Sequence, residues 1–322
     1  MRLIARVILA VGIVFCVAVM PADAAVREYF GSDDFLVPDG QEVIVNVWDI
    51  DLFVRAADTP MVHCTTDLRI AGTGAEKANQ WIVARVPKFS ESDSGLDLSL
   101  DPGNEGFLGI GAFTRRRRIG ILIPHSVIPN LTTSSGAISI DGDFFNADPL
   151  RLRTGSGSID FDGAAKSIEV RTTSGQTSVR VVRPLDHFWA RTSSGPVSLT
   201  GGAHSIEIET ASGNVSLSAL SGSVSVTSVG GTLVLDWDRL GPDATVTLRS
   251  LKGDITVTLP RGTHPQGVLT TTSGAIKSGF PGEVNEAGDT VTLVGDGPRL
   301  EIETASGAIL LRENRGWFAP EE

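Results

Sequence analysis

Residues 133–140 read Thr133-Ser134-Ser135-Gly136-Ala137-Ile138-Ser139-Ile140, and this stretch decides the fold because its pattern returns along the chain. The pattern is Thr-x-Ser-Gly-x-apolar-x-apolar, and successive glycines from Gly136 to Gly274 lie 18 to 22 residues apart. A fixed period of about 20 residues indicates stacked repeats, each of which buries its apolar face only against its neighbours. Three residues before each of nine glycines there is a Thr or Ser: Thr133, Thr154, Thr172, Thr192, Thr210, Ser228, Ser250, Thr271 and Thr304.

Two short segments of alternating apolar and polar residues flank each glycine. Ile168-Glu169-Val170-Arg171 precedes one glycine, and Val215-Ser216-Leu217 follows another. Because alternation with a period of two is typical of a half-buried strand, each repeat should supply two strands. The sequence therefore predicts an all-β, parallel β-helix-like solenoid of about nine coils, right-handed by the crossover rule and without helices. The expected interior columns are Ile138, Ile159, Val197, Val215, Leu233, Ile255 and Ile276, and beside them Ile140, Phe161, Val179, Leu199, Leu217, Leu235 and Val257.

The repeated glycines are expected to be structural. A sharp corner between two strands needs a positive φ or a close approach of two backbones, and glycine permits both. The Thr or Ser three residues earlier can close the turn or form hydrogen bonds along the stack. Because the Ser before each glycine is itself repeated and has no Gly-x-Ser-x-Gly elbow around it, it is not expected to be a nucleophile. The predicted turn glycines are Gly136, Gly157, Gly175, Gly195, Gly213, Gly253, Gly274 and Gly307.

The start of the chain predicts export. Arg2 and Arg6, the apolar run 7–20 and the small-x-small site 22–24 are typical of a cleavable signal peptide. The apolar run is shorter than the ~20 residues of a membrane span, which disfavours the alternative of an uncleaved anchor. We expect a mature chain that begins at Ala25, has no transmembrane span, and lies in the periplasm, at the cell surface or outside the cell.

The rest of the chain divides by pattern. The expected parts are residues 1–24 as signal peptide, 25–130 as an irregular β-rich part of the solenoid with a cap, 131–312 as the repetitive solenoid, and 313–322 as a tail. Within the repetitive part, the interval 279–297 is expected to be an inserted long loop or hairpin.

Composition argues against several classes of function. The formal net charge is −11, so a nucleic acid is not an expected partner. Cys64 would be the one cysteine left after cleavage, and we expect it to be buried rather than paired. The histidines are scattered without a metal-binding motif, so neither a metal nor a cofactor is expected. Stacked carboxylates leave Ca²⁺ as an alternative, although no calcium-loop motif accompanies them: Asp141, Asp143, Asp160 and Asp162.

Arginines are the candidate binding residues. Four arginines are consecutive in sequence, and three others share one position of consecutive coils. Such groups could contact a polyanion such as an acidic glycan, because guanidinium groups bind carboxylates and phosphates in a bidentate manner. The alternative is a solvated, charge-neutralised surface with Glu169 and Glu207 nearby. The candidate polyanion contacts are Arg115, Arg116, Arg117, Arg118, Arg153, Arg171 and Arg191.

The C-terminal copies carry a family resemblance. Residues 269–276 read Leu-Thr-Thr-Thr-Ser-Gly-Ala-Ile, and residues 297–307 read Gly-Pro-Arg-Leu-Glu-Ile-Glu-Thr-Ala-Ser-Gly. With a strand that ends at Pro124 before the first coil, they resemble the bacterial putative-adhesin domain family of unknown function, which is related to the head domains of putative autotransporter adhesins. The resemblance covers roughly residues 30–312. It implies a β-helix-like fold and an exported location, and it brings no catalytic residues to carry over.

Three functions follow as hypotheses. The first is an exported, non-enzymatic, adhesin-like or envelope scaffold protein whose partner is an envelope or extracellular protein or glycan. The second is a binding module for acidic glycans. The third is a carbohydrate-active enzyme of the β-helix type, which needs paired carboxylates in a cleft between long loops. Coils of 18 to 22 residues leave little chain length for such loops, so a non-enzymatic protein is favoured.

Overall fold

The computed structural model describes residues 25–92, 95–100, 114–144 and 149–314, which form two compact units divided after Asp160. The predicted signal peptide and residues 315–322 of the predicted tail lie outside the described residues. Both units consist mainly of parallel strands, so the predicted all-β, solenoid-like fold class is confirmed. No helix in the described ranges is long and apolar enough to cross a membrane.

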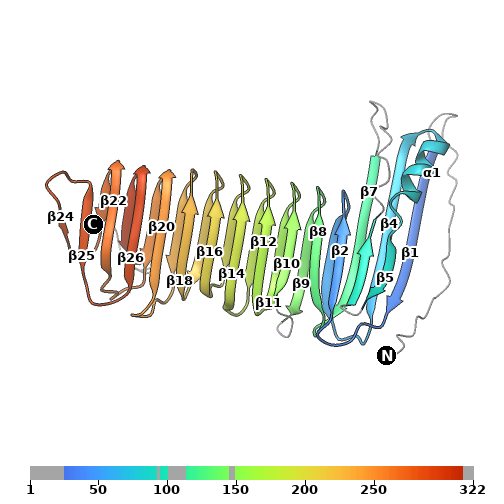
Figure 1. Ribbon diagram of the computed structural model, residues 1–322, viewed down its shortest axis with the longest axis horizontal. Helices are drawn as coiled ribbons and strands as arrows, with labels where there is room; N and C mark the ends of the chain where they lie inside the picture. The colour runs from blue at the N-terminus through green and yellow to red at the C-terminus, as the bar shows by residue number, and fades with distance from the viewer. Residues whose placement is uncertain (1–24, 93–94, 101–113, 145–148, 315–322) are drawn as a thin grey trace. The chain divides into compact units, whose positions relative to one another are not determined.

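Unit 1 contains ten strands that lie wholly within its described residues, and one helix (Figure 1). Its elements are β1 (Ala25–Phe35), β2 (Glu42–Val47), β3 (Asp51–Ala57), β4 (Val62–Thr73), α1 (Ala75–Val83), β5 (Lys88–Ser92), β6 (Gly95–Ser99), β7 (Thr114–Pro124), β8 (Ile128–Thr133), β9 (Ile138–Phe144) and β10 (Leu150–Thr154). The next strand, β11 (Ile159–Ala165), spans the division between the units.

The strands of unit 1 are not stacked in sequence order. The β3 sheet has the order β1-β4-β7-β3-β9, and the β2 sheet has the order β5-β6-β2-β8-β10. The coil formed by β2 and β3 therefore lies between the β6–β7 coil, which follows it in sequence, and the β8–β9 coil. The outer pairs β1–β4, β4–β7 and β5–β6 are antiparallel, so this part departs from a regular parallel solenoid.

Helix α1 was not expected from the sequence. It has nine residues, and its N-cap, Gly74, forms no side-chain capping bond, so the usual start signal is missing. Ala78, Trp81 and Ile82 are buried on one face of the helix, which packs on β1 and β4. Burial of this short apolar face therefore stabilises the helix more than its local sequence does.

Unit 2 holds the regular coils. Its elements are β12 (Ser167–Thr172), β13 (Thr177–Val181), β14 (Leu185–Thr192), β15 (Val197–Thr200), β16 (Ala203–Thr210), β17 (Val215–Leu220), β18 (Ser223–Ser228), β19 (Leu233–Trp237), β20 (Thr245–Lys252), β21 (Ile255–Leu259), β22 (Gln266–Ser273), β23 (Ile276–Ser278), β24 (Gly282–Val284), β25 (Thr290–Val294), β26 (Arg299–Ser306) and β27 (Ile309–Glu313).

The last coil of the chain is inserted between two earlier ones. The β16 sheet has the order β12-β14-β16-β18-β20-β26-β22-β25-β24, and the β17 sheet has the order β13-β15-β17-β19-β21-β27-β23. Ile309 consequently pairs with Ile255 on one side and with Ile276 on the other. The sequence had placed Ile276 directly beside Ile255, and that part of the column was wrong. The predicted insertion at 279–297 does contain a hairpin, formed by β24 and β25.

The predicted interior columns are otherwise present in unit 2. Val215 pairs with Leu233, which pairs with Ile255, and each side chain is at most 1% exposed. In the coil before Val197 the same column position is taken by Thr177, a buried residue whose hydroxyl has no hydrogen-bond partner. The core is thus a ladder of branched aliphatic side chains, in which burial contributes most of the stability.

The predicted turn glycines all lie at corners between two strands of one coil. A Cβ added to Gly195 would lie 2.0 Å from the carbonyl oxygen of Gly175, and one added to Gly157 would lie 1.8 Å from that of Gly136. The backbones of neighbouring coils therefore approach too closely for any side chain. Gly253 has a positive φ of 136° as well, but the close approach to a backbone carbonyl of a neighbouring coil recurs at Gly136, Gly213, Gly274 and Gly307.

The Thr of the motif closes the corner. The N–H of Gly195 donates to Oγ1 of Thr192 over 2.9 Å, which joins residues three apart. Oγ1 of Thr271 donates to the carbonyl oxygen of Gly307 in the neighbouring coil over 3.1 Å. Thr154 makes both kinds of bond, because its Oγ1 accepts from the N–H of Gly157 over 3.0 Å and donates to the carbonyl oxygen of Gly136 over 3.3 Å. One buried hydroxyl thus satisfies a backbone donor within its coil and a backbone acceptor in the neighbouring one. Ser250 departs from this pattern, because its Oγ is buried without a partner.

Candidate functional site

The outward surface of the β16 sheet carries two regular columns of polar side chains, which we call the ladder face. Strand register places equivalent residues of successive coils side by side, at the ~4.8 Å spacing of neighbouring strands. The first column is Glu169, Trp189, Glu207, Ser225, Thr247 and Glu301, and the second is Arg171, Arg191, Glu209, Thr227, Arg249 and Glu303.

Arg171, Trp189 and Arg191 form one patch on the ladder face. Arg171 and Arg191 are direct cross-strand neighbours on β12 and β14. The Arg171 guanidinium lies over the Trp189 ring, 4.8 Å from its centroid. Two like charges in adjacent register positions repel, and a cation–π contact offsets only part of this cost. The patch therefore offers two guanidinium groups and a half-exposed indole ring to an anionic or flat ligand.

Ion pairs neutralise other charges of the ladder face, and one of these pairs includes Arg191 of the patch. Nε of Arg191 lies 3.4 Å from a carboxylate oxygen of Glu209, and Nη2 of Arg249 lies 2.6 Å from one of Glu301. The four side chains are 44% to 67% exposed, so these ion pairs contribute little to stability. Among the arginines of the two columns, Arg171 is the one that forms no ion pair within the described residues, and its guanidinium stacks on Trp189 instead.

The arginines of unit 1 engage other partners. Nη1 of Arg116 lies 3.0 Å from a carboxylate oxygen of Asp67, and the Arg118 guanidinium lies 5.4 Å from the centroid of the Phe53 ring. Arg115 and Arg153 are both exposed, and Arg153, unlike Arg116, forms no ion pair within the described ranges. Of the seven candidate contacts, Arg171 and Arg191 are thus the two that unit 2 brings together.

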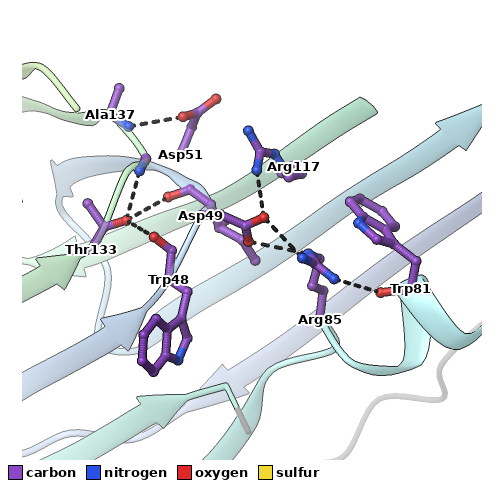
Figure 2. A network of polar contacts seen from close by, with 10 residues as sticks. Trp48, Asp49, Asp51, Trp81, Arg85, Arg117, Thr133 and Ala137 are labelled. Atoms are coloured by element: carbon purple, nitrogen blue, oxygen red, sulfur yellow. Dashed lines mark hydrogen bonds and ion pairs between the residues drawn. The ribbon is translucent and has the colours of Figure 1, made fainter. Parts of the chain in front are cut away.

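Arg117 belongs to a partly buried charge cluster with Asp49 and Arg85, which we call the Asp49 node (Figure 2). Arg85 donates to both carboxylate oxygens of Asp49, over 3.2 and 3.1 Å, and Arg117 donates over 2.6 Å. The Arg85 guanidinium also stacks on the Trp81 ring of α1, 4.6 Å from its centroid. The node joins the loop between β2 and β3 to β7 and to the end of the helix.

The environment of Asp49 lowers the pKa of its carboxyl. Burial alone would raise this pKa, but the hydrogen bonds and positive charges of Arg85 and Arg117 outweigh burial and hold it below its ordinary value of 3.8. The Asp49 and Arg85 side chains are 14% and 13% exposed, so solvent screens their attraction only weakly. Arg117 therefore has a structural contact that competes with any external anion.

The aspartates considered for calcium have partners in the protein. Asp141 forms an ion pair with Arg55 over 3.1 Å, and Asp162 forms one with Arg180 over 2.7 Å. Within the described ranges, no three His, Cys, Asp or Glu side chains gather as metal ligands would. Cys64 is 1% exposed, as predicted, and burial raises the pKa of its thiol, with Asp33 and Asp34 raising it further.

Sequence reasoning missed Trp189 and the Asp49 node. Trp189 stands between two inward residues, Phe188 and Ala190, so the alternation alone could have placed its ring on the outside. No comparable signal exists for the node, because Arg85 and Arg117 follow Asp49 by 36 and 68 residues in a part of the chain without repeats.

Two sheets of mostly parallel strands, joined by in-register glycine corners, define a β-solenoid-like protein. The chain belongs to the Toastrack DUF4097 family, whose family model matches residues 42–312. This confirms the resemblance to an adhesin-like domain family of unknown function. No curated protein matches the chain in sequence.

Several solved structures are similar to the chain at low identity. A putative adhesin from Bacteroides fragilis is 12% identical over 88% of this chain and 97% of its own, with a TM-score of 0.36. A putative cell adhesion protein from Clostridium sporogenes is 13% identical over 90% and 100%, with a TM-score of 0.21. A putative lipid binding protein from Parabacteroides distasonis is 14% identical over 89% and 97%, with a TM-score of 0.45.

Proposed function

We propose that this chain is an exported, non-enzymatic, adhesin-like interaction protein that binds its partner through the ladder face. The observation that supports this most is the Arg171–Trp189–Arg191 patch on a sheet held rigid by in-register corners. Arginine and tryptophan are the residues that dominate binding energy at protein interfaces. A rigid sheet loses little entropy when it binds, so even a small patch of this kind can be effective.

A second candidate function is recognition of an acidic glycan by the same patch. The adjacent guanidinium groups of Arg171 and Arg191 favour it, because a carboxylate or sulfate between them would relieve their repulsion. The Trp189 ring would add an apolar surface for the face of a sugar ring. An extended polymer could then continue along the ladder face, whose rows repeat at ~4.8 Å.

The two candidates are separated by binding measurements on residues 25–322. The probes are alginate, a polyuronate, and dextran as the neutral control, at about 20 and 150 mM salt. Recognition of an acidic glycan predicts salt-sensitive binding to alginate, weakened at least about tenfold in the double variant R171E/R191E. The variant R180E/R312E, with the same charge change on the outward face of the β17 sheet, should bind as the parent does.

The remaining outcomes decide against one candidate or both. If the parent does not bind alginate, the glycan function is wrong, and cross-linking in envelope extracts then tests for a protein partner. Cross-links that persist unchanged in R171E/R191E and in Trp189→Ala would contradict a role for the ladder face altogether.

Export is tested separately from binding. The signal sequence predicts that the protein recovered from cells begins at Ala25, which N-terminal sequencing measures directly. A chain recovered from the cytoplasm with residues 1–24 intact would contradict export.

A further inference from the structure

Strand β1 is a long strand at the edge of the β3 sheet. It forms the end of the β3 sheet and, within the described residues, pairs only with β4. Its 11 residues contrast with the three residues each of β23 and β24, the edge strands of unit 2. Proteins usually shorten, twist or charge such an edge, because its free N–H and C=O groups can pair with another strand.

The usual protections against edge pairing are weak on β1. The strand contains no proline and no lysine, and its one register irregularity lies at its very start, between Ala25 and Val26. The two carboxylates on its outward face already have partners on β4, because Glu28 forms an ion pair with Arg69 over 3.2 Å and Asp34 shares a hydrogen bond with Nδ1 of His63 over 2.6 Å. The side chain of Phe30, in the middle of the strand, is 60% exposed.

Two further charges of β1 lack ion-pair partners. Arg27 and Asp33 lie on the opposite face of the strand from Phe30, and both are half-buried. Arg27 hydrogen-bonds to Asn79 of α1 over 3.0 Å, but within the described ranges neither Arg27 nor Asp33 forms an ion pair. They are six residues apart, about 20 Å along an extended strand, so they cannot reach each other within one chain.

The sequence of β1 is complementary to itself in one antiparallel register. A two-fold axis perpendicular to the sheet through Phe30 would place Arg27 opposite Asp33 twice and the two Phe30 rings side by side. All 11 residues of the strand would then be paired. Moving the axis to Gly31 would set Glu28 against Asp34, which repel, and moving it to Tyr29 would leave Arg27 opposite Gly31.

We propose that β1 pairs with β1 of a second copy of this chain, antiparallel and centred on Phe30, so that the β3 sheets of two molecules join into one. Such an interface is isologous, because the free edge of each β1 strand donates hydrogen bonds to the same edge of the other copy and accepts hydrogen bonds from it. The unpaired Arg27 and Asp33 gain ion-pair partners, and the exposed Phe30 ring gains an aromatic neighbour.

The test is a charge swap, measured by sedimentation velocity on residues 25–322 over a range of concentrations. We expect a reversible monomer–dimer equilibrium. Arg27→Asp or Asp33→Arg alone should weaken it about tenfold, because each sets two like-charged pairs across the interface. The double variant R27D/D33R should restore the parent's dissociation constant within about threefold. Arg153→Asp, with the same charge change on β10, serves as the control.

Each alternative outcome contradicts the proposal. A parent that stays monomeric at every concentration would show that β1 does not pair with a second copy of the chain. A dimer whose dissociation constant is the same in both single variants would use another surface. Restoration in R27D/D33R is diagnostic, because the two residues are too far apart to interact within one molecule. Phe30→Ala is a second probe that should weaken the dimer yet leave the monomer folded, since the ring is exposed.

Discussion

The outer strands of unit 1 and those of unit 2 end their sheets in different ways. Unit 1 uses long antiparallel strands, helix α1 and the partly buried Asp49 node, whereas unit 2 uses the short hairpin of β24 and β25. Unit 2 thereby shortens its edge strands to three residues each, while in unit 1 the 11-residue β1 is, within the described residues, open on one side. The contrast indicates that unit 1 is the place where a second chain can add to the fold.

The two units nevertheless share one device. In each unit, the coil nearest the end of the chain is not the outermost coil of the stack. It lies next to the outermost coil and therefore has a parallel neighbour on each side. In unit 1 this is the β2–β3 coil, and in unit 2 it is the final coil, β26–β27. A coil at the end of a chain frays unless it is held in place, and two parallel partners hold it in both sheets.

The largest expected effect tests this order of coils. Ile309→Ala should lower the free energy of unfolding by about 2–5 kcal/mol, because the side chain is fully buried between two coils. Ile276→Ala, in the outermost coil, should cost about 1 kcal/mol, because its side chain is only half-buried. Urea unfolding measures both values. If the coils were stacked in sequence order, the ranking of the two variants would be reversed.

The second effect concerns the corners, which are alike in both units. Gly195→Ala should cost about 3 kcal/mol, because the added Cβ would lie 2.0 Å from a backbone carbonyl oxygen that cannot move alone. Gly241→Ala is the matched control, since nothing lies within 4 Å of a Cβ at that position. It should change stability by less than about 0.5 kcal/mol. Equal losses in the two variants would mean that close approach does not explain the corner glycines.

The corners could be predicted from the sequence because their contacts are local and repeated. The bond from Gly195 N–H to Thr192 joins residues three apart, and the same pair recurs in coil after coil. The order of the coils could not be predicted, because every coil presents the same corner and the same alternation to its neighbours. Ile309 and Ile276 fit equally well beside Ile255, and the connections, not the motif, decide between them.

The candidate site was predictable in part for a similar reason. Arg171 and Arg191 occupy equivalent positions of consecutive coils, so their periodic spacing alone brought them together. The partners of Arg116 and Arg117 are Asp67 and Asp49, which precede them by 49 and 68 residues in the irregular part of the chain. No periodicity relates those positions, so a run of four arginines could be read as a free cationic surface.

The third effect distinguishes the Asp49 node from the exposed ion pairs of unit 2. Asp49→Asn should cost about 2 kcal/mol at neutral pH, because it leaves Arg85 and Arg117 partly buried without their carboxylate. Glu301→Gln, which breaks the exposed pair with Arg249, should produce no measurable change. Comparable losses in both variants would contradict the difference drawn between the two units.

The contribution of Asp49 should also depend on pH in a defined direction. The pKa of Asp49 is lower in the folded protein than its ordinary value of 3.8, so the unfolded chain takes up the proton first as the pH falls. The stability difference between parent and Asp49→Asn should therefore be constant well above 3.8. It should shrink as the pH falls below that value toward the folded pKa. A difference that grew on acidification would contradict the assigned cause.

The smallest expected effect is a change in the rate at which a thiol reagent labels Cys64, which reports how often unit 1 opens. Cys64 is the one cysteine of residues 25–322, and its thiol is buried with a raised pKa, so a thiol reagent should react only when β4 separates from its neighbours. Labelling at pH 8 should be slower in the folded protein than in urea by at least about a thousandfold. Asp49→Asn should accelerate it roughly thirtyfold, which corresponds to the expected loss of about 2 kcal/mol of stability. Ile309→Ala should leave the labelling rate unchanged if the outer strands of unit 1 open by themselves. Equal acceleration by both variants would show instead that the two units unfold together, as one cooperative structure.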